Sequence, residues 1–160
     1  MPKGCSFTGH RQINMAHKDR IGDMLTRAIN YAYNEGCRDF LTGGALGFDT
    51  LAAREVIRFR QTHQDVRLIL CLPCIDQANN WSDHSRSAYE HILTSSDEVI
   101  YVSEEYTDGC MRERNRLLAE KCDILIAYCA RARSGSGQTI RIAESLGKRV
   151  FNIYSALDKA

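Results

Sequence analysis

Apolar residues gather in six short runs along the chain, and most of these runs are continuous rather than alternating in polarity. Strands that are covered on both faces of a sheet read in this way. The pattern therefore predicts six β-strands, most of them covered on both faces, at residues 4–8, 39–42, 66–72, 98–102, 124–128 and 149–153.

Between these runs, apolar residues recur every three or four positions, which is the spacing of one face of an α-helix. The first such segment ends at Gly36, and its apolar positions are Ile21, Leu25, Ala28, Ile29 and Ala32. Further helices are predicted at about residues 50–62, 83–94, 111–121 and 138–146.

The alternation of strands and helices predicts an α/β fold. Short right-handed crossovers then give a Rossmann-like three-layer sandwich with a mainly parallel sheet of about six strands. No linker, repeat or low-complexity stretch divides the chain, so we expect a single domain over residues 1–160. The order of the strands stays open at this stage.

The composition is that of a globular protein, with 44% hydrophobic and 26% charged residues and a formal net charge of +1. A near-neutral chain gives no bulk electrostatic case for a nucleic-acid partner, which usually needs a strongly basic domain. No apolar stretch approaches the roughly 20 residues that span a bilayer, and the start lacks the apolar run of a signal peptide. We therefore expect a cytoplasmic protein without a membrane partner.

The chain contains seven cysteines, and Cys71 and Cys74 form a Cys-x-x-Cys pair. Redox pairs of this kind open a helix, whereas Cys71 closes an apolar run. A structural zinc site needs about four ligands, and no second pair follows. We expect buried thiols, no metal site and no cofactor.

Small, polar or charged residues follow each of the first five predicted strands. In an open parallel sheet, ligands bind in the crevice outside the carboxyl ends of the strands. The five loops therefore predict one site for a nucleotide-like or phosphosugar-like ligand, built from residues 8–11, 42–49, 73–81, 103–116 and 131–139.

The second of these loops is rich in glycine. Gly43, Gly44 and Gly47 allow a tight turn and a close approach of the backbone to a ligand, or they serve the turn alone. A helix starts just after them, and its free N–H groups favour an anion such as phosphate. Asp49 either caps this helix or accepts a hydrogen bond from a ribose hydroxyl.

The fifth loop offers hydroxyl groups and flexible backbone before another helix, which is the composition of a phosphate-binding loop. It is neither a Walker A loop nor a Gly-x-Gly-x-x-Gly fingerprint. The alternative is a mobile surface loop. The predicted ligand contacts are Ser134, Gly135, Ser136, Gly137, Gln138 and Thr139.

Arg112, Arg114 and Arg116 stand at a predicted helix start, where the helix dipole disfavours cations. A ligand anion would explain this placement, and a solvated basic face is the alternative. Arg112 and Arg116 lie four residues apart and share a face. We therefore expect one or two of the three to reach the site.

The first loop brings Thr8, Gly9, His10 and Arg11 to the same edge. Arg11 is suited to clamp a phosphate with its forked donors. His10 either bonds a ligand, acts as an acid or base, or is structural. Trp81 either stacks on a base or packs in the core.

The order and spacing of these motifs resemble the YpsA-like proteins of bacteria over nearly the whole chain. The matching residues include Gln77, Trp81 and the stretch from Met111 to Arg116, which contains Asn115. The YpsA-like family belongs to the SLOG superfamily, with the Lonely Guy enzymes and the DNA-processing protein DprA. The resemblance implies a ligand derived from a nucleotide or ADP-ribose, a homodimer, and a link to bacterial cell division or stress.

The Lonely Guy enzymes are phosphoribohydrolases with a Met-His-Glu-Arg-Lys motif. The resemblance implies that Arg114 occupies the position of the arginine in that motif. Their Gly-Gly-x-Gly-Thr-x-x-Glu loop is not matched, because no glutamate stands three residues after Thr139. Glu113 and Glu144 are then the fallback carboxylates. The leading interpretation is binding or sensing of a nucleotide-derived ligand. The alternatives are hydrolysis of a nucleoside monophosphate and a DprA-like module for single-stranded nucleic acid or protein.

Overall fold

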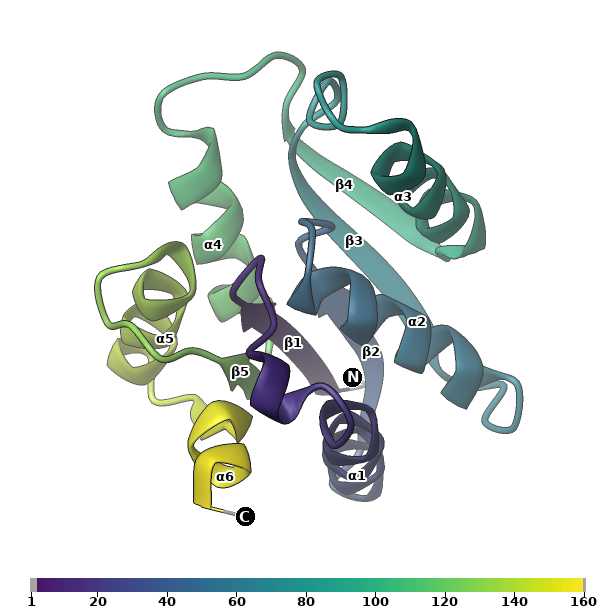
Figure 1. Ribbon diagram of the computed structural model, residues 1–160, viewed down its shortest axis with the longest axis vertical. Coiled ribbons are helices and arrows are strands. Elements are labelled where there is room, and N and C mark those ends of the chain that lie inside the picture. The colour runs from purple at the N-terminus through teal and green to yellow at the C-terminus, as the bar shows by residue number, and fades with distance from the viewer. Residues whose placement is uncertain (1–2, 160) are drawn as a thin grey trace.

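A sheet of six parallel strands runs through the centre of the computed structural model, which describes residues 3–159 (Figure 1). The order of the strands is β4-β3-β2-β1-β5-β6, and every neighbouring pair is parallel. The predicted fold class is confirmed. The strands are β1 (Lys3–Gly9), β2 (Cys37–Thr42), β3 (Arg67–Cys74), β4 (Glu98–Ser103), β5 (Ile124–Tyr128) and β6 (Arg149–Asn152).

Helices cover both faces of the sheet. The core cluster under α1, α2, α3 and α6 lies on one face, and the clusters under α4 and α5 lie on the other. The helices are α1 (Ile21–Asn34), α2 (Phe48–Arg60), α3 (Asp83–Ser95), α4 (Cys110–Lys121), α5 (Gly135–Ser145) and α6 (Ile153–Lys159), with a short 3-10 helix, η1 (Met15–His17).

Strand β3 shows why the apolar runs are continuous. Leu68, Leu70 and Leu72 pack into the cluster under α2, whereas Ile69 and Cys71 pack under α4. Both faces are buried, so both sets of alternating positions are apolar. The thiols of all seven cysteines are free and buried.

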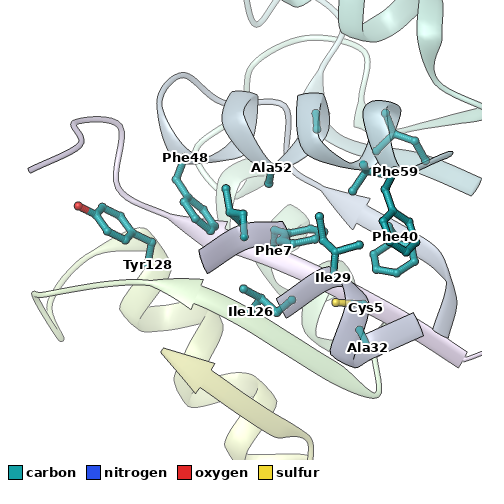
Figure 2. Packing of buried hydrophobic residues seen from close by; sticks show 14 of the residues in the cluster. Cys5, Phe7, Ile29, Ala32, Phe40, Phe48, Ala52, Phe59, Ile126 and Tyr128 are labelled. Atoms are coloured by element: carbon teal, nitrogen blue, oxygen red, sulfur yellow. The ribbon is translucent and has the colours of Figure 1, made fainter. Parts of the chain in front are cut away.

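Aromatic rings fill the core beneath α2 (Figure 2). Phe48, the first residue of that helix, stacks on Tyr128 of β5 with ring centroids 5.4 Å apart. Figure 2 shows this pair together with Phe7 of β1 and Phe40 of β2. Gly9 makes room for the Phe48 ring, since a Cβ at Gly9 would overlap it.

The order of the strands reverses at β1. The chain steps outward from β1 through β2 and β3 to β4, and then returns to place β5 on the other side of β1. The loops after β1 and β5 therefore diverge around a crevice, which is where open α/β sheets bind ligands.

The predicted end of the sixth strand is wrong. Ile153 was assigned to the sixth strand, but β6 ends at Asn152 and Ile153 opens α6. Ile153 and Leu157 lie one helical turn apart, and both are buried. Residues 1, 2 and 160 of the predicted domain lie outside the described residues. Among the residues described, no helix is both long and apolar enough to cross a membrane.

Candidate functional site

A cavity of about 500 Å³ opens at the crevice between the loops after β1 and β5. Its wall comes from those loops, from the loop after β2, from the first turns of α2 and α5 and from one face of α4. The lining residues are Thr8, Gly9, His10, Arg11, Gln12, Ala45, Asp49, Met111, Arg114, Asn115, Leu118, Arg131, Ser134, Gly135, Ser136 and Gln138.

The wall beside β5 is the N-terminus of α5. Ser134 caps this helix, because its Oγ accepts a hydrogen bond from the Gly137 N–H (3.1 Å) and donates to the Arg131 carbonyl (2.6 Å). The helix was predicted to start at Gln138, but it starts at Gly135. The segment predicted as a phosphate-binding loop is therefore largely a first helical turn. This turn holds no acidic residue, so its dipole end favours an anion.

His10 ties this helix to the loop after β1. Its Nε2 accepts a hydrogen bond from the Ala130 N–H (2.8 Å), and its Nδ1 lies 3.3 Å from Ser136 Oγ. A neutral ring that accepts through Nε2 carries its proton on Nδ1 and donates there. Burial and the nearby charge of Arg131 lower the pKa of His10, which favours this neutral form. Both ring nitrogens are thus engaged in protein contacts.

Arg114 enters the cavity from α4. Its side chain is buried, with 6% exposure. Arg114 Nη1 donates to the Gly43 carbonyl (2.7 Å), and its Nε donates to Asn115 Oδ1 (3.0 Å). Asn115 is held in turn by Gln138 Oε1 and the Gly135 carbonyl, at 3.1 and 3.3 Å. These contacts fix the guanidinium in place, and Nη2 makes no hydrogen bond within residues 3–159.

Asp49 enters from the first turn of α2 and is also buried, with 5% exposure. Its Oδ2 accepts from the Ala45 N–H at 3.1 Å. Its Oδ1 is covered from solvent and has no hydrogen-bond partner in the described part of the chain. A buried oxygen without a partner is costly, so this atom marks a place that a ligand group can satisfy.

Asp49 and Arg114 carry opposite charges, yet they form no ion pair with each other within residues 3–159. Burial raises the pKa of Asp49 to about 6, although Arg114, the Ala45 N–H and Arg11 act to lower it. Burial likewise lowers the pKa of Arg114, against the effect of Asp49. For both groups, loss of water therefore outweighs their attraction to each other.

The glycines after β2 lie behind the cavity wall and do not line it. A Cβ at Gly43 would overlap the Arg114 guanidinium, and one at Gly47 would overlap the backbone of Arg11. Gly44 and Gly47 also have positive φ angles, 68° and 77°. These residues let Arg114, Asp49 and the first loop come together, while their own contact with a ligand stays a prediction.

Four other predicted ligand contacts do not line this cavity. Trp81 packs edge-on against Tyr89, with ring centroids 5.1 Å apart, and Gln77 Nε2 donates to the Gly44 carbonyl (3.3 Å). Gly137 gives room to the backbone at Ala132. Thr139 Oγ1 donates to the Gly135 carbonyl (3.1 Å) inside α5.

The remaining candidates on α4 and α5 face solvent. Arg112 is exposed, and so is Arg116, which pairs with Glu120 at 2.7 Å. Glu113 is exposed on α4, and Glu144 on α5 lines a separate hollow beside Cys129. Among the described residues, Asp49 is the acidic side chain that lines the cavity.

Five of the lining residues were not predicted as ligand contacts. Met111 and Leu118 lie three residues before and four after Arg114, so helical spacing places them on the same face of α4. That spacing was a usable signal. Arg131 and Ala45 stood inside the predicted site loops 131–139 and 42–49 without being predicted as contacts, and Gln12 carries no signal beyond its neighbours.

Comparison with known proteins places the chain in a family and supports its fold. The chain belongs to the YspA SLOG family, whose model (YpsA) matches residues 5–145. This confirms the resemblance seen in the sequence motifs.

Similar proteins come from bacteria. The UPF0398 protein BH1768 of Halalkalibacterium halodurans is 33% identical over 104 residues, which are 64% of this chain and 55% of that protein. This chain thus spans little more than half of that relative. The uncharacterized SPbeta prophage-derived protein YoqJ of Bacillus subtilis is 26% identical over 148 residues, 84% of this chain and 82% of YoqJ.

A solved structure with a similar fold is DNA processing protein A of Helicobacter pylori, described for its single-stranded DNA binding mode. The TM-score is 0.67 at 22% identity, and the match covers 94% of this chain and 65% of that one. The likeness supports the shared fold.

Proposed function

We propose that the cavity binds a nucleotide-derived small molecule, which carries a phosphate and a sugar with free hydroxyl groups. The observation that carries the proposal is that Asp49 and Arg114, two buried groups of opposite charge, line the same cavity without contacting each other. Both side chains are buried in the cavity wall, and burial disfavours the charged form of each. They do not form an ion pair with each other. A polar group placed between them would donate to Asp49 and accept from Arg114.

The other half of the proposal concerns the phosphate. The N-terminus of α5 presents N–H groups, the Ser136 hydroxyl lies beside it, and Arg11 and Arg131 line the same cavity. Three arginines against one aspartate make the wall positive, and a helix N-terminus adds to that field. Phosphate is the biological anion that such a wall suits best.

Binding is favoured over hydrolysis because the two carboxylates that the family resemblance offered for catalysis lie outside the cavity. Glu113 and Glu144 are exposed and outside the cavity. We therefore expect no free base when the protein is incubated with AMP or CMP. Release of base that disappears in Arg114→Ala would instead support a hydrolase.

A thermal-shift screen tests the proposal with AMP, CMP, NAD, ADP-ribose and a short single-stranded oligonucleotide. A ligand at a hundred times its Kd stabilises the fold by about 2.7 kcal/mol, so a nucleotide that binds raises Tm by several degrees. Arg114→Ala should abolish the shift. Arg131→Ala should weaken it without touching the buried network.

Arg116→Ala is the matched control, since Arg116 lies on the exposed face of the same helix. It should keep the full shift. If no small nucleotide changes Tm, or if only the oligonucleotide does, the proposal is wrong.

A further inference from the structure

The two helices that begin at the cavity differ in their first turns: that of α2 holds an acidic residue, Asp49, and that of α5 holds none. The α5 side follows β5, and the α2 side follows β2. Strand β1 lies between β2 and β5, so the two sides stand two strand spacings apart, about 10 Å. A single small ligand can therefore meet both sides with different groups.

The α5 side suits an anion. Ser134 caps the helix, no acidic residue stands in its first turn, and Arg131 lines the wall nearby.

The α2 side does not suit an anion, although it is also a helix N-terminus. The Phe48 N–H already donates to the His10 carbonyl (3.1 Å), and the first turn holds Asp49. Asp49 is only 5% exposed, and its Oδ1 has no hydrogen-bond partner among residues 3–159. The group that satisfies this oxygen has to be a hydrogen-bond donor, because an ionised carboxylate only accepts.

A hydroxyl group meets both demands of the α2 side. It donates its proton to Asp49 and accepts from Arg114, whose Nη2 has no hydrogen bond within the described residues. A phosphate ester fails there. Near pH 7 it carries a charge of about −1.5 to −2 and offers few protons to donate, so it would set like charges together in a buried site.

We propose that Asp49 is the specificity-determining residue of this cavity, which selects a free sugar hydroxyl on the α2 side and rejects a phosphate ester there. The ligand class narrows from nucleotide derivatives in general to those with a phosphate at one end and unesterified hydroxyls at the other. This inference rests on the proposed function, since it assumes that a phosphorylated sugar occupies the cavity.

Isothermal titration calorimetry with four adenine nucleotides tests the inference at pH 7.5. The probes are AMP, its 2',3'-dideoxy analogue, adenosine 2',5'-bisphosphate and adenosine 3',5'-bisphosphate. The wild-type protein should bind AMP at least about tenfold more tightly than the dideoxy analogue and at least one of the bisphosphates, a difference of about 1.4 kcal/mol.

Asp49→Asn removes the charge and keeps the shape. In this variant the preference for AMP over the rejected bisphosphate should fall by about tenfold or more. Asp83→Asn is the control, because Asp83 stands in the first turn of α3 but is exposed and outside the cavity. Its binding profile should match that of the wild type.

Four results would overturn the inference. If AMP binds and both bisphosphates bind equally well, or if Asp49→Asn leaves the preference unchanged, Asp49 does not set specificity while the proposed function stands. If none of the four nucleotides binds while CMP, NAD or ADP-ribose raises Tm, the inference fails and the proposed function stands; if no small nucleotide of either set binds, both fail. Thermal melting of each variant shows that it is folded.

Discussion

Two helices begin at the same edge of the sheet, α2 after β2 and α5 after β5, and their first turns are built for opposite tasks. At α5 a serine caps the helix, and the first turn is free of acidic residues. At α2 a glycine with positive φ stands at the cap, an aspartate follows, and the first N–H is used by the loop after β1. A helix N-terminus is thus an anion site only when its neighbours leave its N–H groups and its field available.

The glycine cap of α2 gives the largest expected effect. Gly47→Val would force a β-branched residue into a left-handed conformation and into the backbone of Arg11. We expect a loss of about 3–5 kcal/mol in the free energy of unfolding. Urea denaturation measures this loss.

Gly22→Ala provides the control for that experiment. A Cβ at Gly22 meets nothing within 4 Å, and the residue lies within α1. The change should leave stability unchanged or raise it by about 0.5–1 kcal/mol. If Gly47→Val had only a mild effect, the loops after β1 and β2 would not need the close approach of Gly47 to the backbone of Arg11.

The buried charge of Asp49 predicts a variant that is more stable than the wild type. The pKa of this carboxyl is about 6 in the folded protein and 3.8 by its ordinary value, so the folded state holds the proton to higher pH. Its ionisation therefore costs stability as pH rises from about 4 to 6, and the full cost is present above pH 6. Arg114 and Arg11 are the charges that face it.

Asp49→Asn should accordingly raise the free energy of unfolding at pH 7 by about 2–3 kcal/mol, at roughly 1.4 kcal/mol per pKa unit. The gain should shrink towards zero near pH 4, as urea denaturation across this range would measure. A gain that is equal at pH 4 and pH 7, or a loss at pH 7, would contradict a raised pKa.

The serine cap of α5 offers a cleaner contrast between stability and binding. Ser134→Ala should cost about 1 kcal/mol, the usual value of an N-cap, and should also weaken binding of AMP. Ser82→Ala is its match, because Ser82 caps α3 through the Ser85 N–H (3.2 Å) away from the cavity. Both variants should lose similar stability in denaturation, while calorimetry should show weaker binding for Ser134→Ala alone. If both variants bound AMP equally well, the N-terminus of α5 would not contact the ligand.

The sequence predicted those parts of the fold in which local pattern and tertiary burial agree. The central strands were found because burial on both faces makes their apolar runs continuous, as Ile69 and Leu70 illustrate, whereas the edge strands β4 and β6 contain no fully buried residue. The helix α6 was missed because it follows β6 without a break, and its buried face consists of Ile153 and Leu157 alone.

The site was predictable as a location and less so as a set of contacts. Glycines after a strand indicate close packing, but the sequence cannot say what approaches them. At Gly43 the neighbour is the Arg114 side chain, 71 residues away in the chain. The orphan oxygen of Asp49 is likewise a product of long-range packing, which no local pattern reports.

The smallest expected effect concerns the three arginines of α4, which looked alike in the sequence. Arg116 and Glu120 form an ion pair in which both side chains are about half exposed, 61% and 48%. Exposed pairs of this kind contribute about 0.3–0.5 kcal/mol, so Arg116→Ala should change urea denaturation barely above error and leave nucleotide binding intact. Arg114 lies two residues away but is buried at the cavity, because a helix turns by 200° over that distance. If Arg116→Ala weakened binding as much as Arg114→Ala, the exposed face of α4 would belong to the site, and the division between its two faces would be wrong.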